Sequence, residues 1–179
     1  MMSSSRRVLS WIETEFKRYK GMGEGTMGQL SDEQLAVRAS PESLSIAMIV
    51  WHMAGNLESR FTDFLTTDGE KPWRNRESEF EERHVGRAEL LAKWERGWTF
   101  LFDALAPLGD DDLERTVRVR GEEMPVGQAL MRALAHATYH VGQMTFFGKA
   151  LRGGDWKWLT IPPGQSTAFE KAMKEKGRA

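Results

Sequence analysis

Three of the four histidines, His52, His136 and His140, are the residues whose types and spacing could do chemistry. His136 and His140 are four positions apart, and in a helix this spacing puts both imidazoles on one face, where they can reach the same cation. Because the chain has no cysteine, a transition-metal site must use histidine nitrogen and carboxylate oxygen. Three neutral imidazoles leave a coordination position open to water or substrate, which is typical of catalytic sites.

The residues around these histidines indicate a pocket between two helices. On a wheel of about 100° per residue, His140 lies about 40° from His136, and Gln143 lies about 20° from it on the other side. On the other helix, Asn56 follows His52 at about 40° and continues a polar lane beside the apolar stripe. If the two helices are neighbours, three imidazoles and one amide converge there, as in cofactor sites of helical bundles. The alternative is that they are core histidines held by hydrogen bonds, with both amides bonding at a helix seam.

The composition indicates one soluble, globular domain over residues 1–179. Hydrophobic residues make up 40% of the chain and charged residues 28%, an ordinary balance for a domain with a sizeable core. The 25 basic and 26 acidic residues are interleaved, without the dense basic stripe that nucleic-acid binding requires, so we expect no nucleic-acid partner. No apolar run is long enough for a signal peptide or a membrane span, so we expect no membrane partner. Together with the absence of cysteine, this favours a cytoplasmic location.

The apolar residues recur at helical spacing over four long segments. These predicted helices extend from about residue 8 to 21, from 40 to 68, from about 90 to 106 and from about 126 to 151. The second is expected to begin at Ser40-Pro41, with serine as the cap and proline at the first helical position. The fourth is apolar nearly all round, so we expect it to be central. Residues 31–34 have the form of a capping box and predict a further short helix.

The connecting segments are polar and short. Residues 68–84 form a loop that is too charged to be buried along its length. Apolar and polar residues alternate within residues 116–125, with Gly121 at a turn in the middle, and this pattern predicts a small hairpin. A tail in which Trp156 and Trp158 act as anchors is expected to lie across the bundle before a short charged helix. The predicted fold class is therefore all-α, a four-helix bundle with a small hairpin or loop insertion before the last long helix.

Three segments also carry a resemblance to a known family: WHMAGNLESRFTDFLTTDGEKPWRNRESEF (51–80), RGEEMPVGQALMRALAHATYHVGQM (120–144) and WKWLTIPPGQS (156–166). They resemble the DinB-like superfamily, which overlaps the YfiT-like metal-dependent hydrolases, and are most similar to a bacterial branch without an assigned function. The resemblance spans roughly residues 40–166. It implies a DinB-like four-helix bundle in which His52, His136 and His140 bind one divalent transition metal, either zinc, nickel or iron.

The resemblance also implies a class of chemistry. Some members of the superfamily resemble S-transferases that attach low-molecular-weight thiols such as bacillithiol or mycothiol, and others are described as hydrolases. The chain is thus interpreted as a metal-dependent enzyme acting on a small molecule, foremost a thiol S-transferase. A metal-dependent hydrolase, a non-catalytic metal- or ligand-binding bundle, and an interaction protein without metal are the alternatives. No residue at a family motif position can be carried over as a general base, so the catalytic residues are unknown at this stage.

Elementary chemistry offers two routes at such a metal site. A divalent metal on three imidazoles can lower the pKa of bound water to about 7 or bind a thiol as thiolate near neutral pH. The thiol route needs no separate base, and it benefits from cations that hold the carboxylates of a small thiol. Arg60, on the helix of His52, and Lys71, Arg74 and Arg76, in the following loop, are candidates for that clamp.

Alternative roles and partners follow from the same residues. The basic residues of the loop could instead form a solvated surface or a dimer contact. His84 lies in the charged loop without a partner at ligand spacing and is interpreted as structural. We expect a homodimer through helix faces, because the fourth helix and the tail carry more apolar surface than a small bundle needs.

Overall fold

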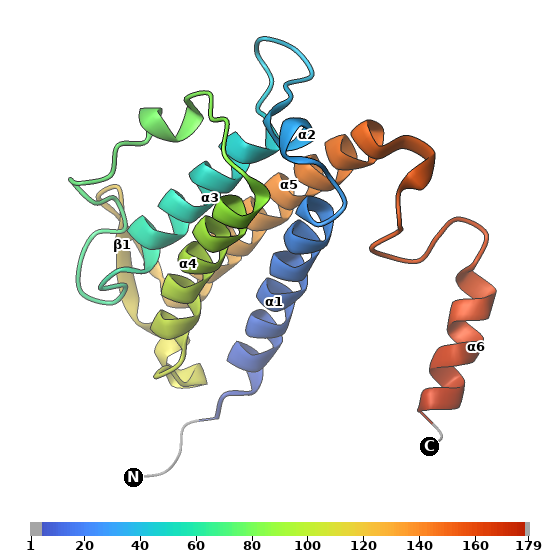
Figure 1. The fold of residues 1–179 in the computed structure, drawn as a ribbon. Coiled ribbons are helices and arrows are strands. Elements are labelled where there is room, and N and C mark those ends of the chain that lie inside the picture. Colours follow the sequence, from blue (N-terminus) through green and yellow to red (C-terminus); the bar gives the residue numbers. More distant parts are fainter. Residues whose placement is uncertain (1–4, 178–179) are drawn as a thin grey trace.

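The structure, a computed structural model, describes residues 5–177 and is mainly helical (Figure 1). The α-helices are α1 (Arg7–Met27), α2 (Asp32–Ala36), α3 (Ile46–Phe61), α4 (Arg87–Leu105), α5 (Val126–Arg152) and α6 (Ser166–Lys176). Short 3-10 helices η1 (Glu77–Phe80), η2 (Asp110–Glu114) and η3 (Gly153–Asp155) join them, and strands β1 (Thr116–Val119) and β2 (Glu122–Pro125) form the sheet. The helical bundle predicted from the sequence is confirmed. Over the described residues, no helix has the length and apolarity that crossing a membrane requires.

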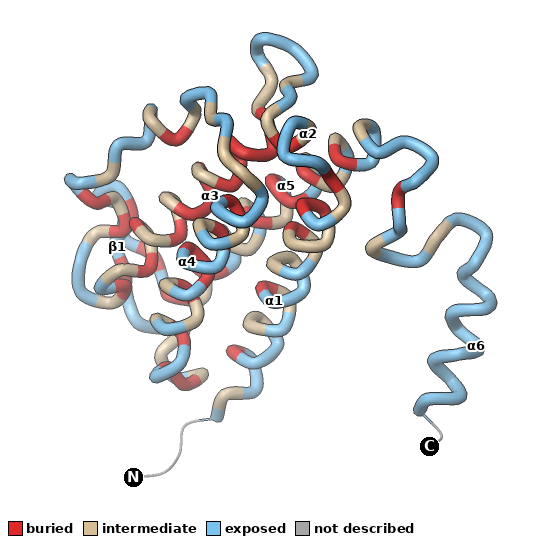
Figure 2. The backbone as a smooth tube through the Cα atoms, viewed as in Figure 1, coloured by how far each residue is buried: buried red, intermediate tan, exposed pale blue. Residues whose placement is uncertain are grey.

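The core lies between α1, α3, α4 and α5, whose buried faces point toward one another (Figure 2). Trp94 and Trp98 of α4 are fully enclosed and meet edge to face, with ring centroids 5.4 Å apart. At Gly97 the backbones of α3 and α4 approach so closely that a Cβ would lie 2.6 Å from the Cα of Ala54. This approach fixes the spacing of α3, which carries His52, against the rest of the bundle.

We expect Gly97→Ala to destabilise the fold. The added methyl group meets backbone rather than a flexible side chain, and overpacking of this kind costs about 1–3 kcal/mol or more of the free energy of unfolding. Urea denaturation followed by circular dichroism measures the change. Gly21→Ala is the control, because it lies within α1 with open space around it and should stabilise the protein by about 0.5–1 kcal/mol. Equal stability of the two variants would contradict the packing argument.

The predicted end of the first helix at Gly21 is wrong, because α1 continues to Met27. Gly23 lies against Trp94, where a Cβ would be 2.5 Å from the indole Cζ2, and Gly25 lies against Leu159 in the same way. Glycine lowers local helix propensity, but here it permits close packing against other elements. The tertiary contacts therefore outweigh the local propensity.

The predicted bounds of the second helix are also wrong. Ser40 and Pro41 belong to a turn closed by Ser43 N–H on Ser40 O, and α3 begins after Ser45, whose Oγ accepts from Met48 N–H at 3.2 Å. The helix ends at Phe61 instead of continuing to Asp68-Gly69. Asp63, just beyond it, has a φ of 48°, a left-handed conformation that stops a helix.

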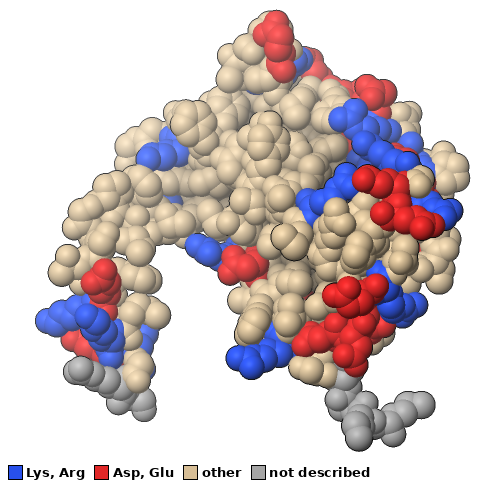
Figure 3. Space-filling model, turned by 180° about the vertical axis from the view of Figure 1, so that it is seen from behind, with Lys and Arg blue, Asp and Glu red and all other residues tan. Residues whose placement is uncertain are grey.

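The last long helix has the predicted bounds but is not central. Met131, Tyr139 and Phe146 of α5 are 70%, 62% and 79% exposed, so this helix packs through one face and leaves the other uncovered. Figure 3, the view from behind, shows few charged residues over the middle of that side. The homodimer expected from this apolar surface stays a prediction.

The tail lies on the bundle only in part. Trp156 is buried, at 8% exposure, beside Gly148 of α5. Trp158 is 42% exposed and lies under the ammonium group of Lys149, 3.7 Å from the ring centroid. The predicted charged helix is present as α6, which has no buried residue and stands apart from the bundle (Figures 1 and 2).

Candidate metal centre

The three histidines singled out by spacing meet in the structure. His52 comes from α3, and His136 and His140 come from α5. Each offers one ring nitrogen, and these atoms lie within 4.8 Å of one another, with His52 Nε2 and His136 Nε2 3.1 Å apart. The two helices are thus neighbours, as the polar lane on each predicted. Among the described residues this is a group of three whose donor atoms could hold one ion.

Hydrogen bonds fix the tautomers of two of the rings. His52 Nδ1 lies 2.9 Å from Glu79 Oε2, and because an ionised carboxylate only accepts, this nitrogen carries the proton. His140 Nδ1 donates to Gln143 Oε1 at 2.9 Å, while Gln143 Nε2 donates to the Tyr139 hydroxyl. With the proton on Nδ1, each ring presents its Nε2 lone pair to the centre of the histidine group, where His52 Nε2 lies 3.1 Å from His136 Nε2 and a cation could take its place as partner.

The protonation of the histidines also suits a metal. Burial, followed by repulsion from His140 and His52, lowers the pKa of His136 to about 3. Burial, followed by repulsion from His52, lowers the pKa of His140 to about 4. Both are therefore neutral at pH 7, which is the form that binds metals. Two nitrogens bound to a tetrahedral zinc ion lie about 3.3 Å apart, close to the observed 3.1 Å between His52 and His136.

Glu79 is a residue of the candidate site that the sequence did not reveal. It lies in η1, is only 5% exposed, and joins His52 to Arg74. Arg74 Nε donates to Glu79 Oε1 at 2.8 Å, and a second guanidinium nitrogen donates to Oε2 at 2.9 Å. Burial opposes ionisation, but the hydrogen bonds from His52 and Arg74 outweigh it and lower the pKa of Glu79. An ionised carboxylate on the far nitrogen of a ligating histidine orients the ring and raises its basicity.

Residues 68–84 are mostly exposed or half-buried, as expected, but two charged side chains of this loop are enclosed at the metal centre. The loop is charged, yet Glu79 and the side chain of Arg74, which is 2% exposed, are buried in its middle. Their opposite charges are buried together, so neither is left without a partner. Gly55 of α3 gives the carboxylate its space, because a Cβ there would lie 2.9 Å from Glu79 Cδ and closer still to Oε1. A glycine within a helix, three positions after His52, was the signal available in the sequence.

We expect Gly55→Ala to weaken metal binding without removing a ligand. The methyl group would displace the Glu79 carboxylate from His52, and loss of such an outer partner typically lowers metal affinity by about 10- to 100-fold. Competition with a chromophoric chelator measures the affinity. Gly21→Ala, in open space on α1, should bind like the native protein, and an unchanged affinity in Gly55→Ala would contradict this role of Glu79.

A cavity of about 320 Å³ adjoins the histidines on the side of the hairpin. Its lining comprises His52, Asn56, Arg60, Phe61, Phe64, Arg74, Arg76, Arg118, Val119, Arg120, Met124, Ala129, Arg132, Ala133 and His136. Asn56 and the arginines 60, 74 and 76, singled out in the sequence, therefore face a common space beside the metal centre. Arg118, Arg120 and Arg132 face it too and were missed.

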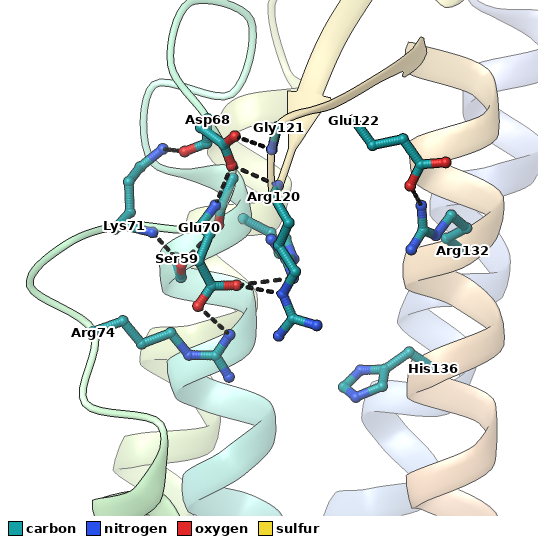
Figure 4. Close-up of polar contacts among 12 residues, drawn as sticks. Ser59, Asp68, Glu70, Lys71, Arg74, Arg120, Gly121, Glu122, Arg132 and His136 are labelled. Atoms are coloured by element: carbon teal, nitrogen blue, oxygen red, sulfur yellow. Dashed lines mark hydrogen bonds and ion pairs between the residues drawn. The ribbon is translucent and has the colours of Figure 1, made fainter.

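The other residues singled out in the sequence lie elsewhere. Gln143 holds His140 and does not line the cavity. Lys71 is not part of the lining, because its ammonium group turns to Thr67 Oγ1, at 2.6 Å, and to the carbonyl of Asp68 (Figure 4). His84 is exposed and lies outside the histidine group.

The fold is similar to that of a DinB-like protein of known structure. The crystal structure of a DinB-like protein from Bacillus cereus ATCC 10987 aligns with a TM-score of 0.60 over 78% of this chain and 89% of that chain, at 18% sequence identity. The chain belongs to the DinB-like family described as "Protein of unknown function (DUF1572)", whose model matches residues 3–165. No curated protein matches the chain. The resemblance noted in the sequence is thus confirmed at the level of family and fold.

Proposed function

We propose that this protein is a metal-dependent enzyme that joins a low-molecular-weight thiol to a small electrophile. The observation that supports the proposal is the position of the three histidines beside a cavity large enough for a small molecule. His52, His136 and His140 would hold one divalent ion, zinc, nickel or iron. Such an ion supplies Lewis acidity, so that a thiol bound to it ionises near neutral pH.

The surroundings of the histidines favour a thiol over water as the nucleophile. Hydrolysis usually requires a general base within hydrogen-bond reach of the attacking water. Among the described residues, the cavity lining contains no carboxylate and no histidine besides His52 and His136. Glu79 is a poor base, because both its oxygens already accept hydrogen bonds and its pKa is lowered. A thiol needs no such base once it is ionised, since the thiolate is itself the nucleophile.

The remaining polar residues receive positioning roles in this proposal. Asn56 and Arg60 line the cavity and contact the substrate. Arg74 acts through Glu79, and Gln143 acts through His140, so both position metal ligands. Arg76 lies over the Phe80 ring, whose other neighbour is His52. We further propose that the enzyme is a cytoplasmic homodimer.

A thiol-transfer screen tests the proposal. Metal-loaded protein is incubated with bacillithiol, mycothiol, glutathione or coenzyme A and with monochlorobimane as a general electrophile. In the reaction a carbon–sulfur bond forms, the carbon–chlorine bond breaks, chloride leaves and the thiol proton passes to solvent. At least one thiol should react faster with the native protein than with His140→Ala. If none does, the transferase proposal is refuted, and turnover of ester or amide substrates by the same preparation would replace it with hydrolysis.

A further inference from the structure

The cavity beside the histidines is surrounded by six arginines, and its lining contains no acidic side chain. They come from four separate parts of the chain: Arg60 from α3, Arg74 and Arg76 from the loop, Arg118 and Arg120 from the hairpin, and Arg132 from α5. Convergence of like charges from separate elements is costly unless an opposite charge meets them. The acidic partners of these arginines are not among the lining residues.

Three of these arginines pair with separate carboxylates, although Arg74 Nη1 is buried without a hydrogen-bond partner among the described residues. Arg74 is bound by Glu79 on two nitrogens. Arg76 donates to Glu77 and covers the ring of Phe80. Arg118 pairs with Glu123 across the hairpin. These arginines line the cavity with at least one nitrogen already paired to the chain.

Arg60, Arg120 and Arg132, the three-arginine cluster, keep donors for a ligand. Arg60 donates through Nη2 to Glu70 at 3.3 Å, but its Nη1 is buried and has no hydrogen-bond partner among the described residues. Arg120 reaches the same carboxylate through Nε at 2.8 Å. Arg132 is held by Glu122 at 3.1 Å through a single nitrogen. Figure 4 shows Arg120 and Arg132 on either side of the space beside His136.

Two guanidinium groups of the three-arginine cluster share one carboxylate. Glu70 is shared by Arg60, Arg120 and, at 4.0 Å, Arg74. Burial, with repulsion from Arg120 and Arg74, lowers the pKa of Arg60 even though Glu70 opposes this. Because Arg74 is also paired with Glu79, Glu70 is shared mainly by Arg60 and Arg120, and a divalent ion on the histidines would add further positive charge.

The hairpin holds Arg120 in place through contacts with the loop after α3. Asp68 accepts from the backbone N–H groups of Arg120 and Gly121, at 2.8 and 2.7 Å (Figure 4). These residues form the turn and have φ values of 55° and 78°. Gly69 N–H also donates to the Arg118 carbonyl, at 2.8 Å. The turn is thus fixed against the loop after α3, so the guanidinium of Arg120 needs little reorganisation to meet a ligand.

We infer that the cavity binds a dianionic oxyanion, a phosphate or a dicarboxylate, through the three-arginine cluster. Guanidinium groups present paired donors that match carboxylate and phosphate oxygens. The inference rests on the proposed function insofar as it places this anion on the substrate, with the reacting end toward the histidines. It specifies that the substrate carries two negative charges at the end opposite its reacting atom.

Isothermal titration calorimetry with inorganic phosphate, succinate and acetate tests this inference on protein of measured metal content. Phosphate or succinate should bind saturably. The one that binds more tightly shows whether the anionic group of the substrate is a phosphate or a dicarboxylate. Acetate should bind much more weakly. Arg132→Gln should weaken the tighter dianion by about tenfold, because a charge-assisted donor is lost. Arg115→Gln is the matched control, since Arg115 is similarly exposed, pairs with Asp112 and does not line the cavity.

Two further results separate this inference from the proposed function. Anion binding should persist in His140→Ala, because the arginines supply it, and its loss there would show direct binding to the metal and overturn the inference. Equal affinities of the native protein and the Arg120→Gln and Arg132→Gln variants would overturn it as well. Thiol transfer without dianion binding refutes only this inference. Dianion binding without thiol transfer supports it and refutes only the transferase proposal.

Discussion

His140→Ala protein is expected to retain almost no divalent metal, whereas the native protein binds one ion per chain. Removal of one ligand leaves two imidazoles, which cannot fix a three-nitrogen coordination geometry. Elemental analysis after incubation with zinc, nickel or ferrous ion and removal of free metal measures the stoichiometry. His136→Ala should behave in the same way, because its nitrogen lies 3.1 Å from that of His52.

The control for this experiment is His84→Ala. His84 is exposed and lies outside the histidine group, so its loss should leave the stoichiometry at one. Far-ultraviolet circular dichroism of all variants should match the native spectrum, because the core around Trp94 and Trp98 does not include the histidines. A native stoichiometry near zero, or full binding by His136→Ala combined with His140→Ala, would refute the metal site.

The histidine group could be predicted because its geometry depends on helices alone. His136 and His140 lie within one uninterrupted helix, so their spacing fixes their common face. The prediction that His52 joins them depended only on α3 being a neighbour of α5. The polar lane from His52 to Asn56 indicated which side of α3 faces α5. The hairpin was equally local, since the alternation and Gly121 determine it without distant contacts.

Glu79 could not be predicted in this way. It lies in a loop without periodicity, and its position depends on Arg74 and on the space left by Gly55. The arginines of the hairpin were missed for a related reason. Asp68, far away in sequence, orients the turn that carries Arg120.

Competing local signals explain the errors in helix bounds. Ser40-Pro41 and Ser45 are both acceptable starts for a helix, and the structure uses Ser45. The glycines of α1 are poor helix formers, but contacts with Trp94 and Leu159 keep them helical. In both cases the residue at which the helix begins or ends depends on tertiary packing, which cannot be read from the sequence.

Glu79→Ala is expected to lower both the stability of the fold and the affinity for metal. The substitution leaves the Arg74 guanidinium, whose side chain is 2% exposed, without its main partner, and breaking a buried pair typically costs about 3–5 kcal/mol. His52 also loses the acceptor of its Nδ1 proton, which should weaken metal binding by about 10- to 100-fold. Urea denaturation of metal-free protein and chelator competition measure the two effects separately. Glu77→Ala, at an 86% exposed side chain of the same 3-10 helix, should change neither.

A second pair of variants separates the two roles of this carboxylate. Arg74→Leu combined with Glu79→Leu removes both buried charges, and hydrophobic replacement of a whole buried pair is often neutral or stabilising. Stability should therefore recover relative to Glu79→Ala, whereas metal affinity should stay low because His52 still lacks an acceptor for its proton. Glu79→Gln should recover part of the metal affinity, since the glutamine amide oxygen can accept from His52. Its stability should stay low, because the neutral amide cannot neutralise Arg74. Recovery of metal affinity in the double leucine variant would show that Glu79 serves the fold and not the metal.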